Sequence, residues 1–328
     1  MSGNSPVLTI AIPTYNRARC LERLLAVLRN EIEGEARVEL LVSDNASTDG
    51  TEALVEAYRA DGTAIVYIRN SENMGADRNI LQCFNRANGK YVWIFGDDDI
   101  VAPGTVHRVL EAMSTQTYQL ICVTSYFSKN ETIQAKKFKH CPDMEFTSAN
   151  DLARRVHVLF TFISGVIINK ESVSSASHPP FESLFDTNLG QLGLFFTALN
   201  CHRKSLLIRD PLVTATANRG VGYGLYKVFG TNLAKITREW IEDESVQRSI
   251  INGTIQKFLP VWIFLSRKSM ASSVAEDPHE ILRNCFGRYS RYWIFNYPIY
   301  ALPLPLASAW LMLVRVINKC HTLLLSGT

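Results

Sequence analysis

The sequence predicts an α/β fold, a mostly parallel sheet flanked by helices and followed by a C-terminal helical region. Three observations support this. Apolar strand-like runs alternate with amphipathic helical patterns in the first third, polar residues follow each run, and the last third is rich in helical Trp, Phe, Ile and Leu. A chain of 328 residues can bury a large core. We expect a catalytic domain over 1–218 and a helical region over 219–328.

Strands and helices alternate from the start of the chain. Strands are expected at residues 7–12, 38–42, 65–68 and 91–95, and helices at 21–28, 51–59 and 76–87. The strands are short apolar runs, whereas the helices space their apolar residues three and four apart. Alternation of this kind places parallel strands side by side with helices on both faces, and ligands of such sheets bind at the carboxyl ends of the strands.

The fourth strand ends in Gly96 and three consecutive carboxylates, Asp97, Asp98 and Asp99. Adjacent acids repel one another unless a cation lies near them. Mg²⁺ and Mn²⁺ prefer oxygen ligands and leave positions open for phosphate oxygens, so we expect a metal site here. The alternative is a polar turn in which Asp98 or Asp99 caps the next helix.

Composition excludes some function classes. The net charge is only +3 and the basic residues are scattered, so nucleic-acid binding is not expected. The seven cysteines are far apart and never form a C-x-x-C pair, which is typical of reduced thiols rather than disulfides or zinc ligands. The short polar start of the sequence shows no signal peptide, and we therefore expect a cytoplasmic location.

Four segments in order carry a resemblance to a known family. They are Ile10–Asn16, Val42–Thr51, Asn73–Gly75 with Arg78–Asn79, and Phe95–Asp99. Together they resemble the family-2 glycosyltransferases of GT-A, or Rossmann-like, fold. The resemblance covers residues 6–125 and implies an acceptor part at 126–218. The sequence is most similar in appearance to bacterial sugar transferases of the abequosyltransferase type, which build O-antigen and related surface glycans.

The resemblance implies a nucleoside diphosphate sugar as donor. A base pocket would be lined by Pro13, Thr14, Tyr15 and Asn16. Asp44 would accept a hydrogen bond from a pyrimidine, which suits both UDP and CDP. Asn73, Gly75 and Arg78 would approach the ribose and phosphates, although Arg78 could also pair with the acid cluster or be a solvated helix charge. We expect Asp49 to cap the helix that begins near Thr51.

The resemblance also assigns the acid cluster. The spacing departs from the family's acid, any residue, acid, acid, because Gly96 falls on the first acid. We assign Asp98 and Asp99 to Mn²⁺ or Mg²⁺ and Asp97 to the ribose side; an Asp97–Asp99 pair is the alternative. The ion would neutralise the leaving diphosphate, which makes Asp99 catalytic.

A general base is needed if the reaction inverts the sugar. The acidic pair that the family places at the start of a downstream helix is missing, since Gly190–Gln191 stand there. Asp186 is the best candidate base, ahead of Glu182 and His178, and its alternative role is the N-cap of a helix over 189–199. The gap also leaves a retaining outcome open.

A glycine-rich loop over 218–224 contains Arg219. Glycines give a loop the freedom to act as a lid, so Arg219 could close over the diphosphate; a plain linker is the alternative.

The helical region is expected at residues 225–269 and 280–325. Its segment 299–314 has no charges but is interrupted by Pro303 and Pro305, so it is expected to lie in a bilayer interface rather than cross it. This favours a peripheral enzyme on the inner face of the cell membrane with a glycan acceptor linked to undecaprenyl lipid. The alternative for this region is a packed helical subdomain or a dimer interface.

The sequence therefore predicts a metal-dependent glycosyltransferase of bacterial surface polysaccharide synthesis. Two other hypotheses stay open. One is a nucleotide-binding or nucleotidyltransferase-like protein that transfers no sugar, and the other is a helical scaffold that is an enzyme only secondarily.

Overall fold

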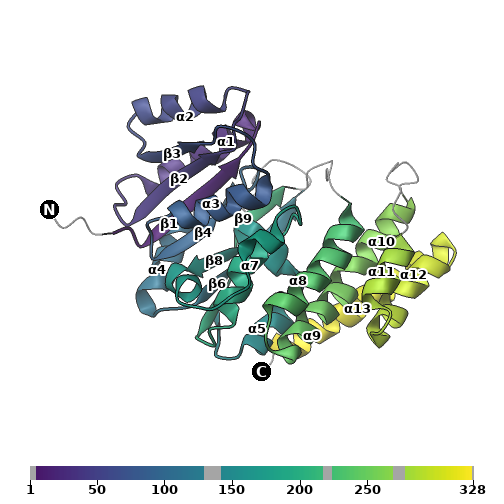
Figure 1. Cartoon of the computed structure of the whole chain (residues 1–328). Helices are drawn as coiled ribbons and strands as arrows, with labels where there is room; N and C mark the ends of the chain where they lie inside the picture. Colours follow the sequence, from purple (N-terminus) through teal and green to yellow (C-terminus); the bar gives the residue numbers. More distant parts are fainter. Residues whose placement is uncertain (1–4, 129–141, 217–223, 269–277, 327–328) are drawn as a thin grey trace. The chain divides into compact units, whose positions relative to one another are not determined.

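The computed structural model describes residues 5–128, 142–216, 224–268 and 278–326. The chain forms two compact units (Figure 1). The first unit comprises Met1–Ala149 and Leu159–Arg219, and the second comprises Asn150–Val158 and Gly220–Thr328.

The first unit is built on one sheet. Its strands are β1 (Leu8–Thr14), β2 (Val38–Asp44), β3 (Ile65–Arg69), β4 (Tyr91–Ile94), β5 (Ile100–Val101), β6 (Leu120–Ser128), β7 (Met144–Phe146), β8 (Val166–Asn169) and β9 (Ser205–Thr216). Along the sheet they follow the order β3-β2-β1-β4-β8-β6-β9-β5, with β7 paired to β9. The first four are parallel to one another, as predicted, whereas β8 is antiparallel to both its neighbours.

Helices cover both faces of this sheet. They are α1 (Ala18–Ile32), α2 (Thr51–Ala60), α3 (Ala76–Arg86), α4 (Thr105–Thr115), α6 (Lys170–Ser174) and α7 (Gln191–Leu199), with short turns η2 (Ile163–Gly165) and η3 (Phe181–Leu184). Apolar side chains of β1 and β2 share one core cluster with α1 and α4. Asn79 and Gln82 of α3 bond to Ser43, which alternates with Val42 of that cluster and therefore points to the opposite face (Figure 1).

Asp49 joins the starts of two helices. Its carboxylate accepts hydrogen bonds from the backbone N–H of Thr51, at 3.1 Å, and of Ala18, at 2.9 Å, which are the first residues of α2 and α1. Although burial opposes the shift, these bonds hold the pKa of Asp49 below its ordinary value. The predicted capping role of Asp49 is confirmed.

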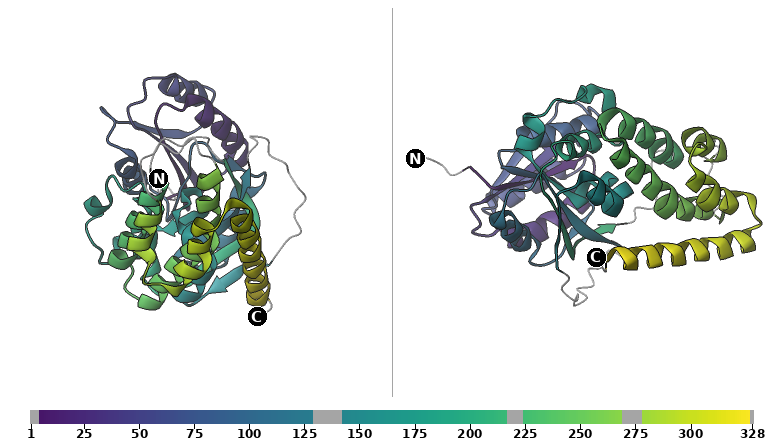
Figure 2. Two further views of the ribbon diagram at one scale, coloured as in Figure 1. Left: turned by 90° about the vertical axis from the view of Figure 1, so that its right-hand side faces the viewer. Right: turned by 90° about the horizontal axis from the view of Figure 1, so that it is seen from below.

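The second unit is helical. It contains α5 (Ala149–Val156), the start of η1 (His157–Thr161), η4 (Lys227–Asn232), α8 (Leu233–Trp240), α9 (Glu244–Gly253), η5 (Thr254–Phe258), α10 (Leu259–Lys268), α11 (Pro278–Phe286), η6 (Tyr292–Asn296), α12 (Tyr297–Ala301) and α13 (Leu304–Ser326). Its core cluster includes Ile255, Leu259, Phe286 and Ile299. Figure 2 shows α13 as one long helix.

The prolines divide the predicted interfacial segment, as expected from the sequence. Helix α12 ends at Ala301 and α13 begins at Leu304, so Pro303 and Pro305 lie at the junction and in the first turn. Within the part of the chain that the structure describes, none of the helices combines the length and the hydropathy that a membrane crossing requires.

His157 is buried in the helical unit without a hydrogen-bond partner for its Nδ1 atom. A Cβ atom on Gly253 would lie 2.3 Å from the Cβ of His157, so α9 packs directly on this residue. Burial, together with the nearby charges of Lys257 and Arg155, lowers the pKa of His157 to about 3. The folded protein therefore holds this imidazole neutral.

Acidification is expected to destabilise the protein through His157. Between pH 6.5 and pH 3 the unfolded chain binds a proton that folded His157 does not, so the free energy of unfolding falls as the pH falls. At pH 5 the loss from this group is about 2 kcal/mol. His157→Gln should remove this loss in urea unfolding compared at pH 7 and pH 5, whereas His107→Gln, at an exposed histidine, should not. An unchanged loss in His157→Gln would contradict the assignment.

Candidate functional site

The ends of the first four strands form one polar edge of the sheet. Thr14 pairs with Asp44, and Asp44 pairs with Arg69, so β1, β2 and β3 end at the same level. The hydroxyl of Thr14 donates a 2.8 Å hydrogen bond to Asp97, three residues beyond the end of β4. The predicted convergence of the first and fourth strand ends is thus present in the fold.

Side chains from other parts of the chain contact the acid cluster. Arg17 Nη1 lies 3.1 Å from Asp97 Oδ1 and 2.9 Å from Asp98 Oδ2. Asp99 accepts a 2.6 Å hydrogen bond from the buried hydroxyl of Ser164, which in turn accepts the N–H of Gly96. Because α4 begins at Thr105 with Gly104 before it, neither Asp98 nor Asp99 caps the next helix, and that alternative is wrong.

Burial and a nearby cation act in opposite directions on Asp97. The side chain is only 5% exposed, and this burial is the main reason why the pKa of its carboxyl group is raised, to about 6 once all its neighbours have acted. Arg17 and the hydrogen bond from Thr14 lower this pKa, whereas the charge of Asp98 raises it. The crevice thus contains clustered negative charge, and Arg17 compensates part of it.

Two carboxylate oxygens converge above Gly96. A Cβ atom on this glycine would lie 3.0 Å from Asp99 Oδ2 and 3.4 Å from both Asp98 Oδ1 and Ser164 Oγ. Carboxylate and hydroxyl oxygens are the donors that Mg²⁺ and Mn²⁺ prefer, so the residues present fit such an ion. Among the described residues no group of three His, Cys, Asp or Glu side chains gathers to hold an ion. An ion here would keep positions for water and phosphate.

The loop after β1 presents an exposed aromatic ring. Tyr15 is 42% exposed, whereas Pro13 is partly buried at the end of the strand. Asn16 adopts a left-handed backbone with φ of 51°, and its side chain accepts a 2.7 Å hydrogen bond from the N–H of Thr48. Its own N–H donates to Ser47 Oγ at 2.9 Å. These hydrogen bonds join the first predicted motif to the second.

Asp44 is the last residue of β2 and is fully buried. One carboxylate oxygen accepts a 2.8 Å hydrogen bond from the N–H of Ser47, and the other accepts a 2.7 Å bond from the hydroxyl of Tyr67. Arg69 Nε lies 3.7 Å from the second oxygen. Contact between Asp44 and a nucleobase would therefore require the Ser47 loop or the Tyr67 ring to move.

Asn45 organises the loop that precedes α3. Its amide donates a 2.7 Å hydrogen bond to Asn73 Oδ1, and its carbonyl oxygen accepts the N–H of Met74 at 3.1 Å. Gly75 has φ of 88°, a conformation that favours glycine, and its N–H donates to Asn73 Oδ1 at 3.0 Å. These bonds fix the predicted third motif against the second.

Arg78 contacts Asp186, the predicted base. Arg78 Nη1 lies 3.6 Å from Asp186 Oδ1, and the guanidinium stacks 4.2 Å from the centre of the Phe185 ring. The side chain of Asp186 is 81% exposed and its backbone has φ of 64°. The ion pairs described for Asp97 and Asp98 are made by Arg17, and the one described for Arg78 is with Asp186.

Asp77 takes the capping role that the sequence analysis offered to Asp186. The carboxylate of Asp77 accepts hydrogen bonds from the backbone N–H groups of Thr187, Asn188 and Gly190, at 2.9, 3.0 and 2.9 Å. Gly190 is the residue that precedes α7. The N-cap alternative for Asp186 is therefore wrong, and its carboxylate stays at the surface beside Arg78.

The predicted lid residue Arg219 lies outside the described residues.

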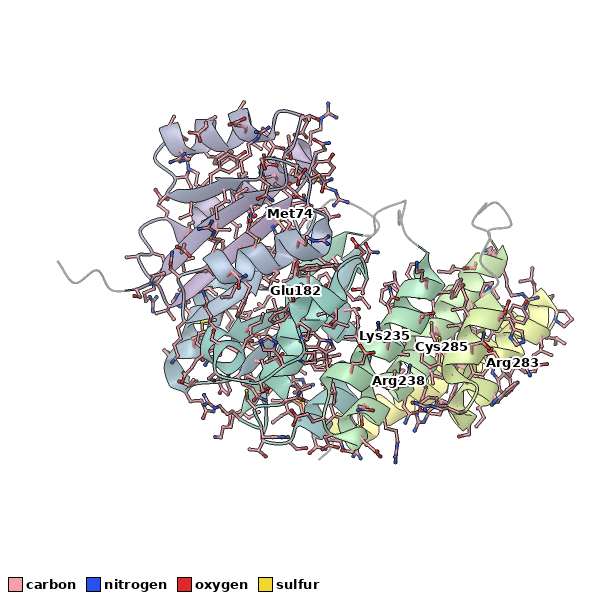
Figure 3. The ribbon with its side chains drawn as sticks, viewed as in Figure 1. Met74, Glu182, Lys235, Arg238, Arg283 and Cys285 are labelled. Atoms are coloured by element: carbon pink, nitrogen blue, oxygen red, sulfur yellow. The ribbon has the colours of Figure 1, made fainter. Side chains whose placement is uncertain are left out.

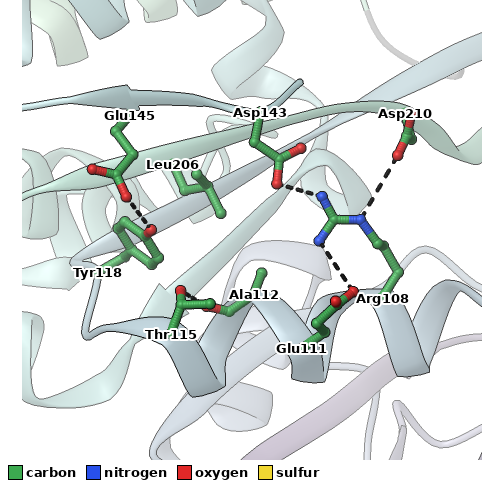
Figure 4. Close-up of a pocket in the computed structure, with 9 residues that line it drawn as sticks. All are labelled: Arg108, Glu111, Ala112, Thr115, Tyr118, Asp143, Glu145, Leu206 and Asp210. Carbon is green, nitrogen blue, oxygen red and sulfur yellow. Dashed lines mark hydrogen bonds and ion pairs between the residues drawn. The ribbon is translucent and has the colours of Figure 1, made fainter. Parts of the chain in front are cut away.

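A separate cavity of about 540 Å³ lies in the first unit, on a part of the sheet that contributes none of the predicted site residues (Figure 4). Arg108 is one of the residues that line it, and its guanidinium pairs with Asp143 and lies 3.7 Å from Asp210. The hydroxyl of Tyr118, another lining residue, donates a 2.6 Å hydrogen bond to Glu145. These ion pairs and hydrogen bonds bind the walls of the cavity together.

Sequence reasoning missed three residues that shape the site. Arg17 directly follows the first motif, and Ser164 and Asp77 belong to no motif. Ser164 lies 65 residues after Asp99, and Asp77 lies 113 residues before Gly190. Pairs this far apart become visible only in the folded chain.

Curated proteins similar to this chain are sugar transferases. Over 182 residues the chain is 32% identical to abequosyltransferase RfbV of Salmonella typhimurium, covering 50% of this chain and 53% of that protein. It is 28% identical to a GalNAc(5)-diNAcBac-PP-undecaprenol beta-1,3-glucosyltransferase of Campylobacter jejuni, covering 32% of this chain and 34% of that protein. The chain thus spans about half or less of the length of these relatives.

Solved structures share the fold. TarS 1–349 of S. aureus in complex with UDP-GlcNAc matches with a TM-score of 0.58 at 18% identity, over 78% of each chain. The mannosyltransferase PcManGT of Pyrobaculum calidifontis, in complex with GDP-Man and Mn²⁺, matches with a TM-score of 0.50 at 14% identity, over 99% of this chain and 80% of that one.

The match to a family model covers most of the sheet and the acid cluster. The model for glycosyl transferase family 2 matches residues 9–175, just over half of the chain. The matched range contains the four motifs and Ser164. This protein belongs to glycosyl transferase family 2.

Proposed function

We propose that this protein is a glycosyltransferase that moves a sugar from a UDP- or CDP-linked donor to a glycan acceptor. The observation that carries the proposal is the acid cluster beside the ends of β1 and β4, with Asp98 and Asp99 oxygens converging above Gly96. Carboxylates can face a diphosphate only through a cation. A strand-end pair of this kind is therefore suited to a nucleoside diphosphate with its metal ion.

Asp98 and Asp99 are assigned to Mn²⁺ or Mg²⁺, and Asp97 to the ribose side of the donor. When bound, the ion would neutralise charge that develops on the leaving diphosphate. Arg17 contacts Asp97 and Asp98 and is half-exposed, so its guanidinium is within reach of a phosphate group that enters the crevice. Solved family-fold neighbours with UDP-GlcNAc, and with GDP-Man and Mn²⁺, support this assignment.

Asp186 is assigned as the base that accepts the proton of the acceptor hydroxyl in an inverting reaction. Its carboxylate is exposed, whereas the carboxylate of Asp77 of α3 accepts hydrogen bonds from three backbone N–H groups of the loop that carries Asp186. The ion pair with Arg78 restrains Asp186 near Gly75 of the third motif. Because Asp77, and not Asp186, holds the backbone of this loop, protonation of the Asp186 carboxylate would not disrupt those hydrogen bonds.

A donor panel tests the proposal. A pyrimidine nucleotide is expected to stabilise the protein more than GDP in thermal unfolding with Mn²⁺, because we assign Asp44, once the Ser47 loop or the Tyr67 ring has moved, as the acceptor of a hydrogen bond from a pyrimidine. A ligand at 100 times its dissociation constant adds about 2.7 kcal/mol to the free energy of unfolding. Release of labelled sugar from UDP- or CDP-sugars is then measured. A preference for GDP would contradict the Asp44 assignment, and nucleotide binding without sugar release would indicate a nucleotide-binding protein instead.

We assign the acceptor to a glycan on undecaprenyl lipid, in O-antigen or related surface polysaccharide synthesis, and place the enzyme peripherally on the cytoplasmic face of the inner membrane. The support is an apolar face on α13, where Leu306, Met312 and Val316 are more than half exposed beside Arg315. Exposed apolar side chains with adjacent cations are typical of interfacial helices. One relative also acts on an undecaprenol-linked substrate by name.

Substituting the α13 face is expected to weaken membrane binding. Leu306→Ser, Met312→Gln and Val316→Ser together remove apolar burial, and high salt removes attraction of about 1 kcal/mol per Lys or Arg near an anionic surface. Flotation with vesicles that contain phosphatidylglycerol should therefore drop in the triple variant and, for the wild type, in high salt. Leu265→Ser, at an exposed leucine of α10, is the control. Equal flotation of all three proteins would indicate that α13 is only a packed helix.

A further inference from the structure

Ser164 is bonded at three points to β4 and to the acid cluster that follows it. The residue lies in the turn η2, which leads into β8, the antiparallel neighbour of β4. The indole Nε1 of Trp93 donates a 2.9 Å hydrogen bond to the backbone oxygen of Ser164. The hydroxyl of Ser164 accepts the N–H of Gly96 at 2.8 Å and donates to Asp99 Oδ2 at 2.6 Å. Because Ser164 is fully buried, these bonds are shielded from water.

The proton of the Ser164 hydroxyl has a defined direction. A serine hydroxyl carries one proton, and since its oxygen accepts the N–H of Gly96, that proton is directed to Asp99. Hydrogen bonds from a hydroxyl to an ionised carboxylate are short and strong, so this bond restrains the rotation of the Asp99 carboxylate. A hydroxyl is neutral, and it therefore orients the carboxylate without cancelling its charge.

The turn between Gly96 and Asp99 adds a second restraint. The N–H of Asp99 donates to the backbone oxygen of Gly96 at 3.2 Å, which closes the turn. The space above Gly96 is narrow, because a Cβ atom there would lie 3.0 Å from Asp99 Oδ2 and 3.4 Å from both Ser164 Oγ and Asp98 Oδ1. The place of Asp99 Oδ2 beside Asp98 thus depends on a hydroxyl from 65 residues further along the chain.

We propose that Ser164 is a positioning residue for the metal site, and that its hydroxyl keeps Asp99 Oδ2 beside Asp98 Oδ1 above Gly96. The inference rests on the proposed function, from which it takes the assignment of Asp98 and Asp99 to Mn²⁺ or Mg²⁺. Ser164 acts through Asp99 and is not itself assigned as a ligand. Loss of the hydrogen-bond partner of a metal ligand typically lowers metal affinity by about 10- to 100-fold.

Ser164→Ala is expected to lower the affinity for Mn²⁺ by about tenfold or more in calorimetric titration of the metal-free protein. Ser205→Ala is the matched control, since Ser205 is also a buried serine of the first unit and accepts a 3.1 Å hydrogen bond from Gln119. Each substitution leaves a buried donor without its acceptor, so both variants should unfold at a lower temperature than the wild type. Only Ser164→Ala should bind Mn²⁺ more weakly. Glu182→Gln, at an exposed acid of η3, reports any Mn²⁺ held by surface acids (Figure 3).

Ser164→Cys is a second variant that fills the place of the hydroxyl. A thiol is a weak hydrogen-bond donor, so Mn²⁺ affinity should fall here as well. Wild-type affinity in both Ser164 variants would overturn the proposal, and so would equal losses of Mn²⁺ affinity in Ser164→Ala and Ser205→Ala.

Sugar transfer, measured in parallel, separates this proposal from the proposed function. Weaker Mn²⁺ binding in Ser164→Ala, with no sugar released from any donor by the wild type, would support the positioning role and contradict the transfer. A wild type that binds neither Mn²⁺ nor Mg²⁺ would overturn the positioning role, whereas sugar transfer that persists in EDTA would still support a glycosyltransferase.

Discussion

Asp99→Asn is expected to reduce sugar transfer by about two to three orders of magnitude, and Asp98→Asn by a similar factor. Asparagine keeps the size of the side chain but removes the negative charge that would hold the ion. Asp99 is 7% exposed and its partner Ser164 can still donate to an amide oxygen, so the fold should tolerate the change. Turnover of the donor is measured at saturating Mn²⁺, together with Mn²⁺ affinity.

The matched control for this pair is Asp61→Asn. Asp61 is an exposed acid at the end of α2, and its described ion pair is with the exposed Arg29. Exposed pairs of this kind contribute little, so turnover should be unchanged. Thermal unfolding of each variant identifies any loss of fold. Near-normal turnover in both Asp98→Asn and Asp99→Asn, with no inhibition by EDTA, would show that the metal assignment is wrong.

The strands and helices of the first third could be predicted because their signals are local. Each expected strand was a short apolar run, and each expected helix had a periodic apolar face, so β1 to β4 and α1 to α3 lie where the sequence placed them. The antiparallel β8 could not be anticipated in the same way. It pairs Ile168 with Val92, residues far apart along the chain, and such pairing depends on the whole fold.

The acid cluster was also a local signal, a strand followed by three carboxylates. Its partners were not local, since Arg17 meets Asp97 from 80 residues away. The same reasoning explains the error over the N-cap of α7. A carboxylate near a helix start usually caps it, but Asp77 of α3 already accepts the free N–H groups there, and Asp186 is left exposed.

Gly89→Ala is expected to destabilise the first unit by about 2–3 kcal/mol. Gly89 precedes β4 and is buried against β1. An added Cβ atom would lie 2.5 Å from the backbone nitrogen of Thr9 and 2.8 Å from the backbone carbon of Leu8. Backbone atoms inside a sheet cannot move aside as a flexible side chain can, so β1 and β4 would have to separate.

Gly50→Ala is the matched control for Gly89→Ala, since a Cβ atom there would meet nothing within 4 Å and the backbone has φ of −75°. Gly50→Ala should change the free energy of unfolding by less than about 1 kcal/mol in either direction. Alanine reduces the conformational entropy of the unfolded chain, and this small stabilising effect offsets any small cost in the folded protein. Urea unfolding of the two variants and the wild type measures these free energies. The dependence of the free energy on urea concentration is compared as well, because an unchanged slope shows that the proteins differ only in stability. Equal free energies for Gly89→Ala and Gly50→Ala would mean that the β1–β4 contact can relax. A selective loss in Gly89→Ala would show that the strand pair joining Thr14 to Asp97 depends on a close backbone approach that only glycine allows.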